Sequence, residues 1–385
     1  MKKSVIQKTI PLRIIAGIIL SLTTTLSFQS NSFAEQQKFP NISGEILAQI
    51  HTDRIVSTQK TGVSPNNSFL YIEPNMSLNF DENWSIKTDW RFQPNNTLTT
   101  RNTTNSERYR TILQNDRGFN PENNGLIVEE LKIDFRNEDM IFFAGKFDPT
   151  FGTAFNKSKK LGIFTSQFAE DYNLREKIGT GISALLENSK LTLNTFFNDT
   201  TGLSRSAMND RKRAGRNDTT AGNTGTLSSY SVSLEGENFL GVHNMFYNLG
   251  YRSLGINSDS NRTKRENGYT FSSEYSYRLG EKTTIVPFVE LVRITDFTGE
   301  LDRDANYATF ALIGKYSGWN AGVSYLDRHI KQKQRSSNIS DQQLQISAGY
   351  RFTNNFAIDI SRSSIKEDGH RGSVVGAVCS YLHKF

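Results

Sequence analysis

The chain has a single cysteine, and beyond its first 40 residues it has no long apolar run. Cys379 is the one cysteine among 385 residues, so no disulfide can form within the chain. Apolar residues make up 36% of the sequence and the mean hydropathy is −0.52. No later run reaches the roughly 18 apolar positions that a transmembrane helix needs. These absences exclude a disulfide-stabilised fold and a bundle of membrane-spanning helices.

The N-terminus differs from the rest of the chain. Basic residues precede an apolar stretch at 14–26, and Ser32-Phe33-Ala34 fits a small-residue cleavage site. This order is typical of a secretory signal peptide, which we expect over residues 1–34 with cleavage after Ala34. A short N-terminal membrane helix is the alternative, and Pro11 argues against it. Residues 35–385 are then expected to form a single domain.

The charge balance gives no support for a nucleic-acid partner. The chain has 45 basic and 39 acidic residues, and the expected signal peptide holds four of the basic residues and none of the acidic ones. Removing it leaves 41 basic against 39 acidic residues, a net charge of +2. Nucleic-acid-binding domains carry a larger and more clustered basic excess, so we expect no nucleic acid as a partner.

The segment WSIKTDWRF, residues 84–92, alternates apolar and polar side chains. Trp84, Ile86 and Trp90 would share one face of a β-strand, because successive strand side chains point to opposite faces. The same two-residue period recurs along the mature chain, and no segment shows a convincing helical stripe. The pattern predicts an all-β protein of about sixteen strands. The predicted outward-facing sets also include Ile127, Ile141 and Phe143.

Short and long connections alternate strictly between these strands. Short polar turns lie at 81–83, 136–139, 187–189, 280–282, 317–318 and 353–355, and long polar connections at 51–67, 94–125, 148–177, 199–226, 253–267, 294–304, 327–341 and 365–372. Bacterial outer-membrane barrels have an even number of antiparallel strands, short periplasmic turns and longer external loops. The sequence therefore predicts a transmembrane antiparallel up-and-down β-barrel in the outer membrane, with both termini in the periplasm. A soluble periplasmic β-sandwich, the alternative fold, has no reason to sort its connections in this way.

Aromatic residues gather near the ends of the expected strands. Beside the short turns lie Trp84, Tyr277, Trp319 and Phe385, and near the long connections lie Trp90, Phe147 and Tyr307. Amphipathic rings prefer the headgroup level of a bilayer, so we expect these residues in two membrane girdles. The apolar strand faces between the girdles are expected to contact outer-membrane lipid and lipopolysaccharide.

Two motifs resemble those of Gram-negative porins. The chain ends in VVGAVCSYLHKF, and the terminal Phe385 of an alternating strand is similar to the signal read by the barrel-assembly machinery. The stretch AGKFDPTFGTAF, residues 144–155, resembles the start of the third long loop in the general and phosphate-selective porin families. The resemblance covers the layout of the whole mature chain. It implies a homotrimeric porin, a water-filled channel for passive diffusion of small hydrophilic solutes and ions.

A barrel of about sixteen strands is wide enough to keep an aqueous lumen, so function depends on what narrows it. The resemblance implies that the loop at 148–177 folds inward as the constriction, and a loop that stays outside is the alternative. Strand parity then predicts the charged residues that line the lumen. The expected constriction has a basic strip of Lys87, Arg91, Lys132 and Lys146, which faces Glu170 and Asp171, with Arg175 also in the loop. Such strips would set a transverse field, but the mixed lumen charges leave the ion preference undecided.

Two other classes of function compete with a channel. A barrel-type surface antigen or adhesin would act through the long connections at 94–125 and 199–226. An outer-membrane enzyme would need a histidine beside a nucleophile or carboxylate. His51, His329 and His370 fall in or near long connections, but no histidine stands in a catalytic motif. We therefore expect no enzyme activity, and nothing in the sequence predicts a metal or a cofactor.

Overall fold

Almost all of the regular secondary structure is antiparallel β-strand, as the two-residue period predicts. The computed structural model describes residues 38–63, 65–94, 124–208, 220–257, 264–332, 338–352 and 355–385, which apart from Lys38 belong to the unit Phe39–Phe385. The expected signal peptide and residues 95–123 lie outside the described residues. Among the described helices, none is both long enough and apolar enough to cross a membrane.

Long strands make up the sheet, and the described helices are short. The strands are β1 (Asn41–Thr58), β2 (Asn66–Asn79), β3 (Trp84–Pro94), β4 (Asn124–Arg136), β5 (Met140–Phe147), β6 (Lys177–Leu186), β7 (Ser189–Asn198), β8 (Ser229–Gly236), β9 (Met245–Leu254), β10 (Glu266–Tyr275), β11 (Tyr277–Arg278), β12 (Thr283–Thr295), β13 (Arg303–Tyr316), β14 (Trp319–Gln332), β15 (Ile339–Arg351), β16 (Phe356–Glu367) and β17 (His370–Lys384). The α-helices α2 (Ala154–Leu161) and α3 (Ser166–Ala169) lie between β5 and β6. The 3₁₀ turns η3 (Gly202–Ser204), η4 (Phe239–Gly241) and η5 (Phe297–Gly299) lie in other connections.

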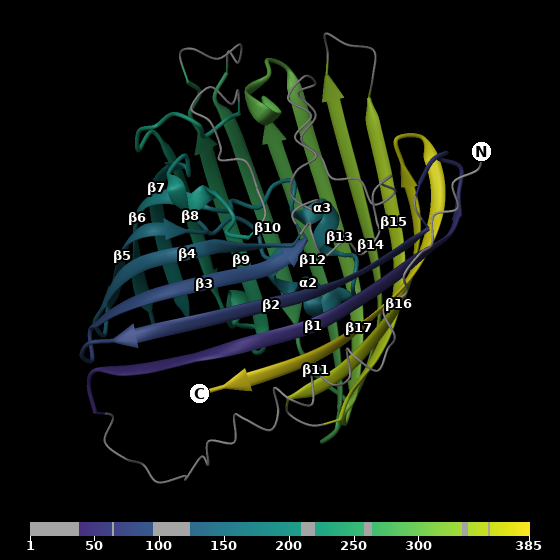
Figure 1. The fold of residues 1–385 in the computed structure, drawn as a ribbon, viewed down its shortest axis with the longest axis horizontal. Coiled ribbons are helices and arrows are strands. Elements are labelled where there is room, and N and C mark those ends of the chain that lie inside the picture. The colour runs from purple at the N-terminus through teal and green to yellow at the C-terminus, as the bar shows by residue number, and fades with distance from the viewer. Residues whose placement is uncertain are drawn as a thin grey trace, which may run out of the picture. The chain divides into compact units, whose positions relative to one another are not determined.

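The sheet closes on itself, because the first strand pairs with both the second strand and the last. β1 pairs antiparallel with β2 and with β17, and the other strands pair in chain order. The short β11 continues β10, since both pair with β12. With β10 and β11 counted as one, the described residues form a closed antiparallel barrel of 16 strands, which confirms the predicted fold (Figure 1).

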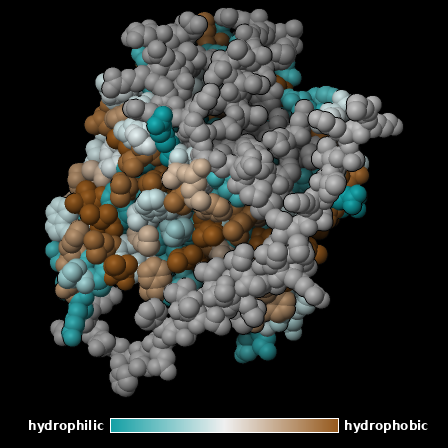
Figure 2. Space-filling view, in the orientation of Figure 1, coloured by the Kyte–Doolittle hydropathy of each residue, from teal (hydrophilic) through white to brown (hydrophobic). Residues whose placement is uncertain are grey.

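Apolar side chains cover the outer wall of the barrel. On β13, Phe310 and Leu312 are 46% and 49% exposed, whereas Ala311 and Ile313 between and beside them are buried. Alternation of this kind recurs on β12, β14 and β15, and Figure 2 shows brown side chains over much of the visible wall. Extensive exposed apolar surface on alternate residues is typical of a barrel that faces lipid.

A bulge shifts the predicted faces of β4. The pairing of β3 with β4 slips between Asp89 and Trp90, so Glu129 has no register partner and Arg91 pairs with Ile127. An extra residue in one strand moves every later side chain to the other face. Ile127 was predicted on the outer face, but it lies on the inner face with Arg91 and is fully buried. That prediction is wrong because the bulge leaves no mark in the apolar pattern.

The predicted faces of β5 are exchanged. Phe142 is exposed and lies opposite the exposed Ile182 of β6, so Phe142 faces outward. Ile141 and Phe143, which were predicted to face outward, therefore face inward. The strand reads MIFFAGKF, with apolar residues at both odd and even positions. The two-residue period is therefore absent here and could not decide the orientation.

Several connections are shorter than the sequence predicts. β1 continues to Thr58, within the connection predicted at 51–67, and only Asp368 and Gly369 join β16 to β17. At the end of the barrel where short turns were predicted, β8 and β9 are joined by the longer connection 237–244. The predicted strict alternation of connection length is therefore wrong. Polar residues at the ends of long strands resemble loops in the sequence, because the apolar pattern stops before the strand does. His51 and His329 consequently lie in strands.

A charge on the outer wall is expected to weaken the barrel. Leu312→Arg would place a cation among exposed apolar side chains, and we expect a loss of about 2–4 kcal/mol in the free energy of unfolding in lipid vesicles. Ser347→Arg is the control, because Ser347 pairs with Ser361 on the inner face. Denaturant titration compares the two variants, and an equal loss in both would contradict lipid contact at Leu312.

Candidate functional site

The connection between β5 and β6, residues 148–176, lies inside the barrel, and we call it the inner segment. Its residues bond with inward-facing side chains of β9, β10, β12, β13, β14 and β15. Figure 1 shows its two helices between β1–β3 and β12–β14. The inner segment therefore takes up interior space that a barrel of this size would otherwise leave to water.

Glu290 of β12 holds the start of α2. Its buried carboxylate accepts hydrogen bonds from the backbone N–H groups of Thr153 and Ala154, the latter at 3.0 Å, and from the Tyr172 hydroxyl at 2.6 Å. Gly152 precedes the helix with a φ of +76°, and a Cβ there would lie 3.2 Å from the Glu290 carboxylate. The first N–H groups of a helix lack partners within it, so a carboxylate at this end is stabilising.

Arg328 of β14 holds the region after α3. Its guanidinium is fully buried and lies 2.9 Å from Asp171 of the inner segment. It also bonds Asp341 of β15 and lies 3.8 Å from Glu367 of β16. The guanidinium carbon is 4.3 Å from the centre of the Phe168 ring. Loss of Arg328 would leave three buried carboxylates without their cation, which is strongly destabilising.

Two further inward side chains bind the backbone of the inner segment. The Gln345 amide of β15 accepts a hydrogen bond from Phe164 N–H at 2.8 Å and donates one to the Leu161 carbonyl at 3.4 Å. Arg252 of β9 donates to the Tyr172 carbonyl and pairs with Glu266. We call Glu290, Arg328, Gln345 and Arg252 the four anchors, because each fixes the inner segment to the wall.

Apolar packing supports the anchors. Phe151, Leu161 and Tyr172 belong to one buried cluster with the inward-facing Phe288 and Val292 of β12. The β12 sequence TTIVPFVELVRIT is apolar on both faces, unlike a strand with a polar lumen face. Apolar residues on both faces of β12 were the sequence signal for where the inner segment packs. The search for alternating apolar and polar residues did not use this signal.

The inner segment also meets the β2–β4 wall, through a row of alternating charges. Arg175 lies 2.6 Å from Glu129 of β4 and 2.8 Å from Glu170. Arg91 of β3 lies 3.5 Å from Glu129 and 3.7 Å from Glu73 of β2. The order Glu73, Arg91, Glu129, Arg175, Glu170 connects the barrel wall to the inner segment, and we call it the charge row.

The remaining predicted basic residues of the strip lie in separate ion pairs. Lys87 of β3 pairs with Asp134 at 2.7 Å and is 43% exposed, and Lys132 of β4 pairs with Glu130 at 2.8 Å. Lys87 and Lys132 therefore each have a carboxylate beside them on the same wall. A basic strip opposite an acidic loop does not form, because opposite charges alternate along the wall.

Lys146 does not face the lumen, contrary to the prediction. Its register partner is Leu131, which is exposed on the outer wall. Its ammonium group is fully buried, 3.0 Å from Glu176 and 2.9 Å from Asp199, and it donates to the Leu203 carbonyl. The connection after β7 therefore covers it. The prediction fails because the orientation of β5 was reversed.

Asp171 and Glu170 are adjacent in sequence but belong to different clusters. Asp171 bonds Arg328 at one wall, whereas Glu170 bonds Arg175 in the charge row. Of the predicted constriction residues, the structure therefore brings together Arg91, Glu170 and Arg175, and it separates Asp171 from them. The contribution of Glu129 was missed, because it lies at the bulge of β4 and belongs to no motif.

The residues predicted for the membrane girdles have different surroundings. Trp84, Tyr277, Trp319 and Phe385 are exposed, and Trp90 is half-buried. Two further residues predicted for the outer girdle are buried, Phe147 and Tyr307. Tyr307 faces inward, with its ring centre 4.9 Å from that of Tyr172 in the inner segment, so its assignment to a girdle is wrong.

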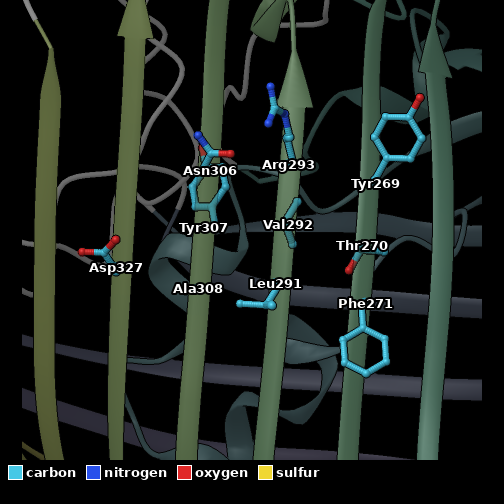
Figure 3. Close-up of a pocket in the computed structure, with 10 residues that line it drawn as sticks. All are labelled: Tyr269, Thr270, Phe271, Leu291, Val292, Arg293, Asn306, Tyr307, Ala308 and Asp327. Carbon is cyan, nitrogen blue, oxygen red and sulfur yellow. The ribbon is translucent and has the colours of Figure 1, made fainter.

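A shallow groove of about 410 Å³ lies over β10, β12, β13 and β14. Figure 3 shows Tyr269, Arg293 and Asn306 at one level, with Leu291 and Phe271 below them. These are alternate residues of their strands and include exposed apolar ones, so the groove lies on the outer wall. Side chains along the groove change from apolar to polar toward the long connections. This change marks the edge of the apolar band on that side of the barrel.

One histidine meets a carboxylate on the outer wall. His329 Nε2 lies 2.7 Å from Asp327 Oδ2, and Ser340 is the register partner of His329. Within the described residues, no hydrogen bond joins the Ser340 hydroxyl to the ring. An activated serine needs that bond to its base, so the arrangement does not form a catalytic triad.

Comparison with solved structures shows the same fold at low sequence identity. The outer membrane channel DcaP of Acinetobacter baumannii has a TM-score of 0.54 and 9% identity, over 89% of this chain and 96% of that one. OprB of Pseudomonas putida has a TM-score of 0.61 and 10% identity, over 89% and 94%. OpdK of Pseudomonas aeruginosa, solved with vanillate, has a TM-score of 0.52 and 11% identity, over 90% and 99%. No family model and no curated protein matches the sequence.

Proposed function

We propose that this protein is an outer-membrane channel for passive diffusion of small hydrophilic solutes and ions. The observation that carries the proposal is a closed barrel with an apolar outer wall and a charged inner wall. Four anchors hold the inner segment against this inner wall. The inward-facing Lys87 and Glu130 keep 43% and 24% of their side-chain surface exposed. DcaP of Acinetobacter baumannii, which has a similar fold, is an outer membrane channel. This similarity supports the proposal.

Conductance across a planar lipid bilayer tests the proposal directly. The purified mature protein is expected to give discrete current steps, because each inserted barrel adds one aqueous path. Circular dichroism confirms that the inserted protein is folded. Folded protein that inserts without current steps would refute the channel and favour a surface antigen or adhesin.

Export, membrane assembly and oligomeric state form a second part of the proposal. The chain would be exported by a signal peptide at 1–34 and assembled through Phe385 as a homotrimer in the outer membrane. Phe385 N–H donates to the Gly44 carbonyl at 3.1 Å and its carbonyl accepts from Gly44 N–H at 3.0 Å. The last residue thus joins the first strand, which supports a role for Phe385 in closing the barrel. Membrane fractionation and mass determination in detergent test these points.

The charges near the charge row favour cations. Five carboxylates and three cations lie there: Glu73, Glu129, Glu130, Asp148 and Glu170 against Arg91, Arg175 and Lys132. An excess of carboxylates along an aqueous path raises the local concentration of cations. We therefore expect reversal potentials in a salt gradient to show a preference for cations.

Asp148 is expected to make this preference depend on pH. Burial raises the pKa of Asp148 to about 7, and the neighbouring Glu129 carboxylate adds to the rise. The folded protein thus holds a proton that the unfolded chain releases near 3.8, so the contribution of Asp148 to stability falls as pH rises between these values. As pH rises through about 7, Asp148 gains its charge and the cation preference should increase.

Asp148→Asn is expected to weaken this pH dependence and to lower the cation preference above pH 7. Asp139→Asn is the matched control, since Asp139 lies in an exposed turn at the other end of β5. Reversal potentials measured from pH 6 to 8 compare the three proteins. A wild-type preference that stays constant over this range would contradict the assignment of Asp148.

A further inference from the structure

Four basic side chains gather on the barrel where β16, β17 and β1 approach the long connections. Arg54 of β1 and Arg362 of β16 are both register partners of Val375 of β17, one on each side. Lys366 of β16 is the register partner of Arg371 of β17. Register partners lie about 5 Å apart on one face of a sheet, so these four residues form one surface, which we call the basic patch.

The basic patch lies on the outer wall. Val375 is exposed, as is Ile360, two residues before Arg362 on β16. Ser361 and Ser363, on either side of Arg362, are buried against the interior. Since alternate residues share a face, Arg362 points outward with Ile360. The patch therefore begins where the apolar part of β16 ends, at the edge of the band that faces lipid.

Small hydroxyl side chains form the floor of the patch. Ser364 of β16 is the register partner of Ser373 of β17, and Ser57 Oγ of β1 lies 3.1 Å from Ser373 Oγ. Both serine pairs lie between the level of Arg362 and that of Lys366. Hydroxyl groups can donate hydrogen bonds to an anion, and their small size leaves room for one between the four cations.

Among the described residues, the cations of the patch have no counter-ion. In the described part of the chain, no carboxylate forms an ion pair with any of the four. Asp327 of β14, which faces outward two strands from β16, is bonded by His329 at 2.7 Å and by the Gln342 amide at 3.3 Å. Arg293, in the groove of Figure 3, differs, because Asp304 lies 4.0 Å from it. Unpaired cations beside lipid are costly, so the patch is expected to bind an anion.

We propose that the basic patch binds the phosphorylated glycolipid of the outer leaflet, lipopolysaccharide. Its phosphates would lie over the serine floor, bonded by the guanidinium groups of Arg54 and Arg362, which suit phosphate geometry. Its acyl chains would lie on two exposed apolar side chains: Ile360, two residues before Arg362 on β16, and Ile346, which lies beside Arg362 as its register partner on β15. A partner with both a phosphate and an acyl chain fits this surface, because cations and apolar residues adjoin on it.

The dimensions of the patch favour a ligand with more than one phosphate. Arg54 and Arg362 lie on either side of one strand, which places them about 10 Å apart. Arg362 and Lys366 are four residues apart on one strand, which is about 13 Å. A single phosphate cannot contact all four cations over these distances. Bisphosphorylated lipid A is therefore the probe of choice, and its dephosphorylated form is the matched ligand control.

Binding of lipid A to the detergent-solubilised barrel, counted by native mass spectrometry, tests the proposal. The test variant combines Arg54→Gln with Arg362→Gln. The control variant combines Arg293→Gln with Lys331→Gln, which removes two positive charges from β12 and β14 of the same outer wall. We expect about 30-fold weaker binding for the test variant, from the usual contribution of two basic residues at an anionic surface, and a change below about twofold for the control. Arg54→Lys with Arg362→Lys keeps the charges and should retain most of the binding.

Three results would overturn the proposal. They are unchanged binding in the test variant, equal weakening in both glutamine variants, and equal wild-type binding of dephosphorylated lipid A. A change in oligomeric mass with unchanged lipid binding would instead assign the patch to contact between copies of the chain. Wild-type binding must also weaken as ionic strength rises, a readout that needs no variant. Conductance should stay unchanged in the test variant, so failure here is distinct from failure of the channel function.

Discussion

Arg328→Ala is expected to release the inner segment from β14 and to raise the single-channel conductance. Arg328 is fully buried and is the cation between Asp171 of the inner segment and Asp341 of the wall. Without it, these carboxylates and Glu367 would repel one another in a site that water does not reach. Removal of one partner from a buried ion pair costs about 3–5 kcal/mol. The docked arrangement would lose that stabilisation, and the lumen would widen.

Two matched variants separate release of the segment from general loss of stability. Arg303→Ala removes another buried arginine, but its ion pair is with Glu300, in the connection between β12 and β13. It should lower the unfolding temperature without changing the conductance. Arg328→Lys keeps the charge but loses the planar donor fork, so an intermediate conductance is expected. A wild-type conductance in Arg328→Ala would show that this anchor does not hold the inner segment.

The barrel itself could be predicted from the sequence, because lipid and water impose opposite demands on its two walls. On β13 the demand is visible in each residue, with Phe310 and Leu312 outside and Ala311 and Ile313 inside. The prediction of individual faces failed on β5, where MIFFAGKF is apolar at odd and even positions. Both faces of that strand carry apolar side chains, so the pattern that would distinguish them is absent. Strand number is thus a stronger inference than strand orientation.

The partners within the lumen could not be predicted from the sequence. Glu290 and Ala154 are 136 positions apart, and Arg328 and Asp171 are 157 apart. Short motifs do not report contacts over such separations, since these depend on how one loop packs against a distant wall. The sequence did show that charged residues occur at 148–177, but it did not show that Glu170 and Asp171 face different clusters. Their separation follows from the turn after α3.

The contacts of the inner segment differ between two parts of the wall. Toward β9–β15 it is held by the four anchors and by packing of Phe151 and Leu161 against Phe288. Toward β2–β4 it contributes Arg175 to the charge row, where its contacts are ion pairs rather than apolar packing. Apolar packing and buried anchors give rigidity, whereas charges that line an aqueous path give ion preference. Substitutions in the two regions should therefore have different effects.

Arg175→Gln is expected to increase the cation preference about fivefold without a large change in conductance. Arg175 is the cation between Glu129 and Glu170, and its removal leaves two carboxylates with less compensation. A permeating cation about 4 Å from one such carboxylate gains about 1 kcal/mol in water, which is about a fivefold change in occupancy. Reversal potentials in a salt gradient measure the permeability ratio of cation to anion.

Charge changes elsewhere on the barrel provide the comparison for Arg175→Gln. Arg293→Gln removes the same charge from the outer wall, where the side chain is 66% exposed, and it should leave the permeability ratio unchanged. Lys132→Glu reverses a charge near the row and should increase the cation preference further. If Arg175→Gln and Lys132→Glu both behave like Arg293→Gln, the charge row does not lie on the path of the ions. If all three variants shift the ratio alike, the preference comes from the net charge of the barrel and not from the position of Arg175 between Glu129 and Glu170.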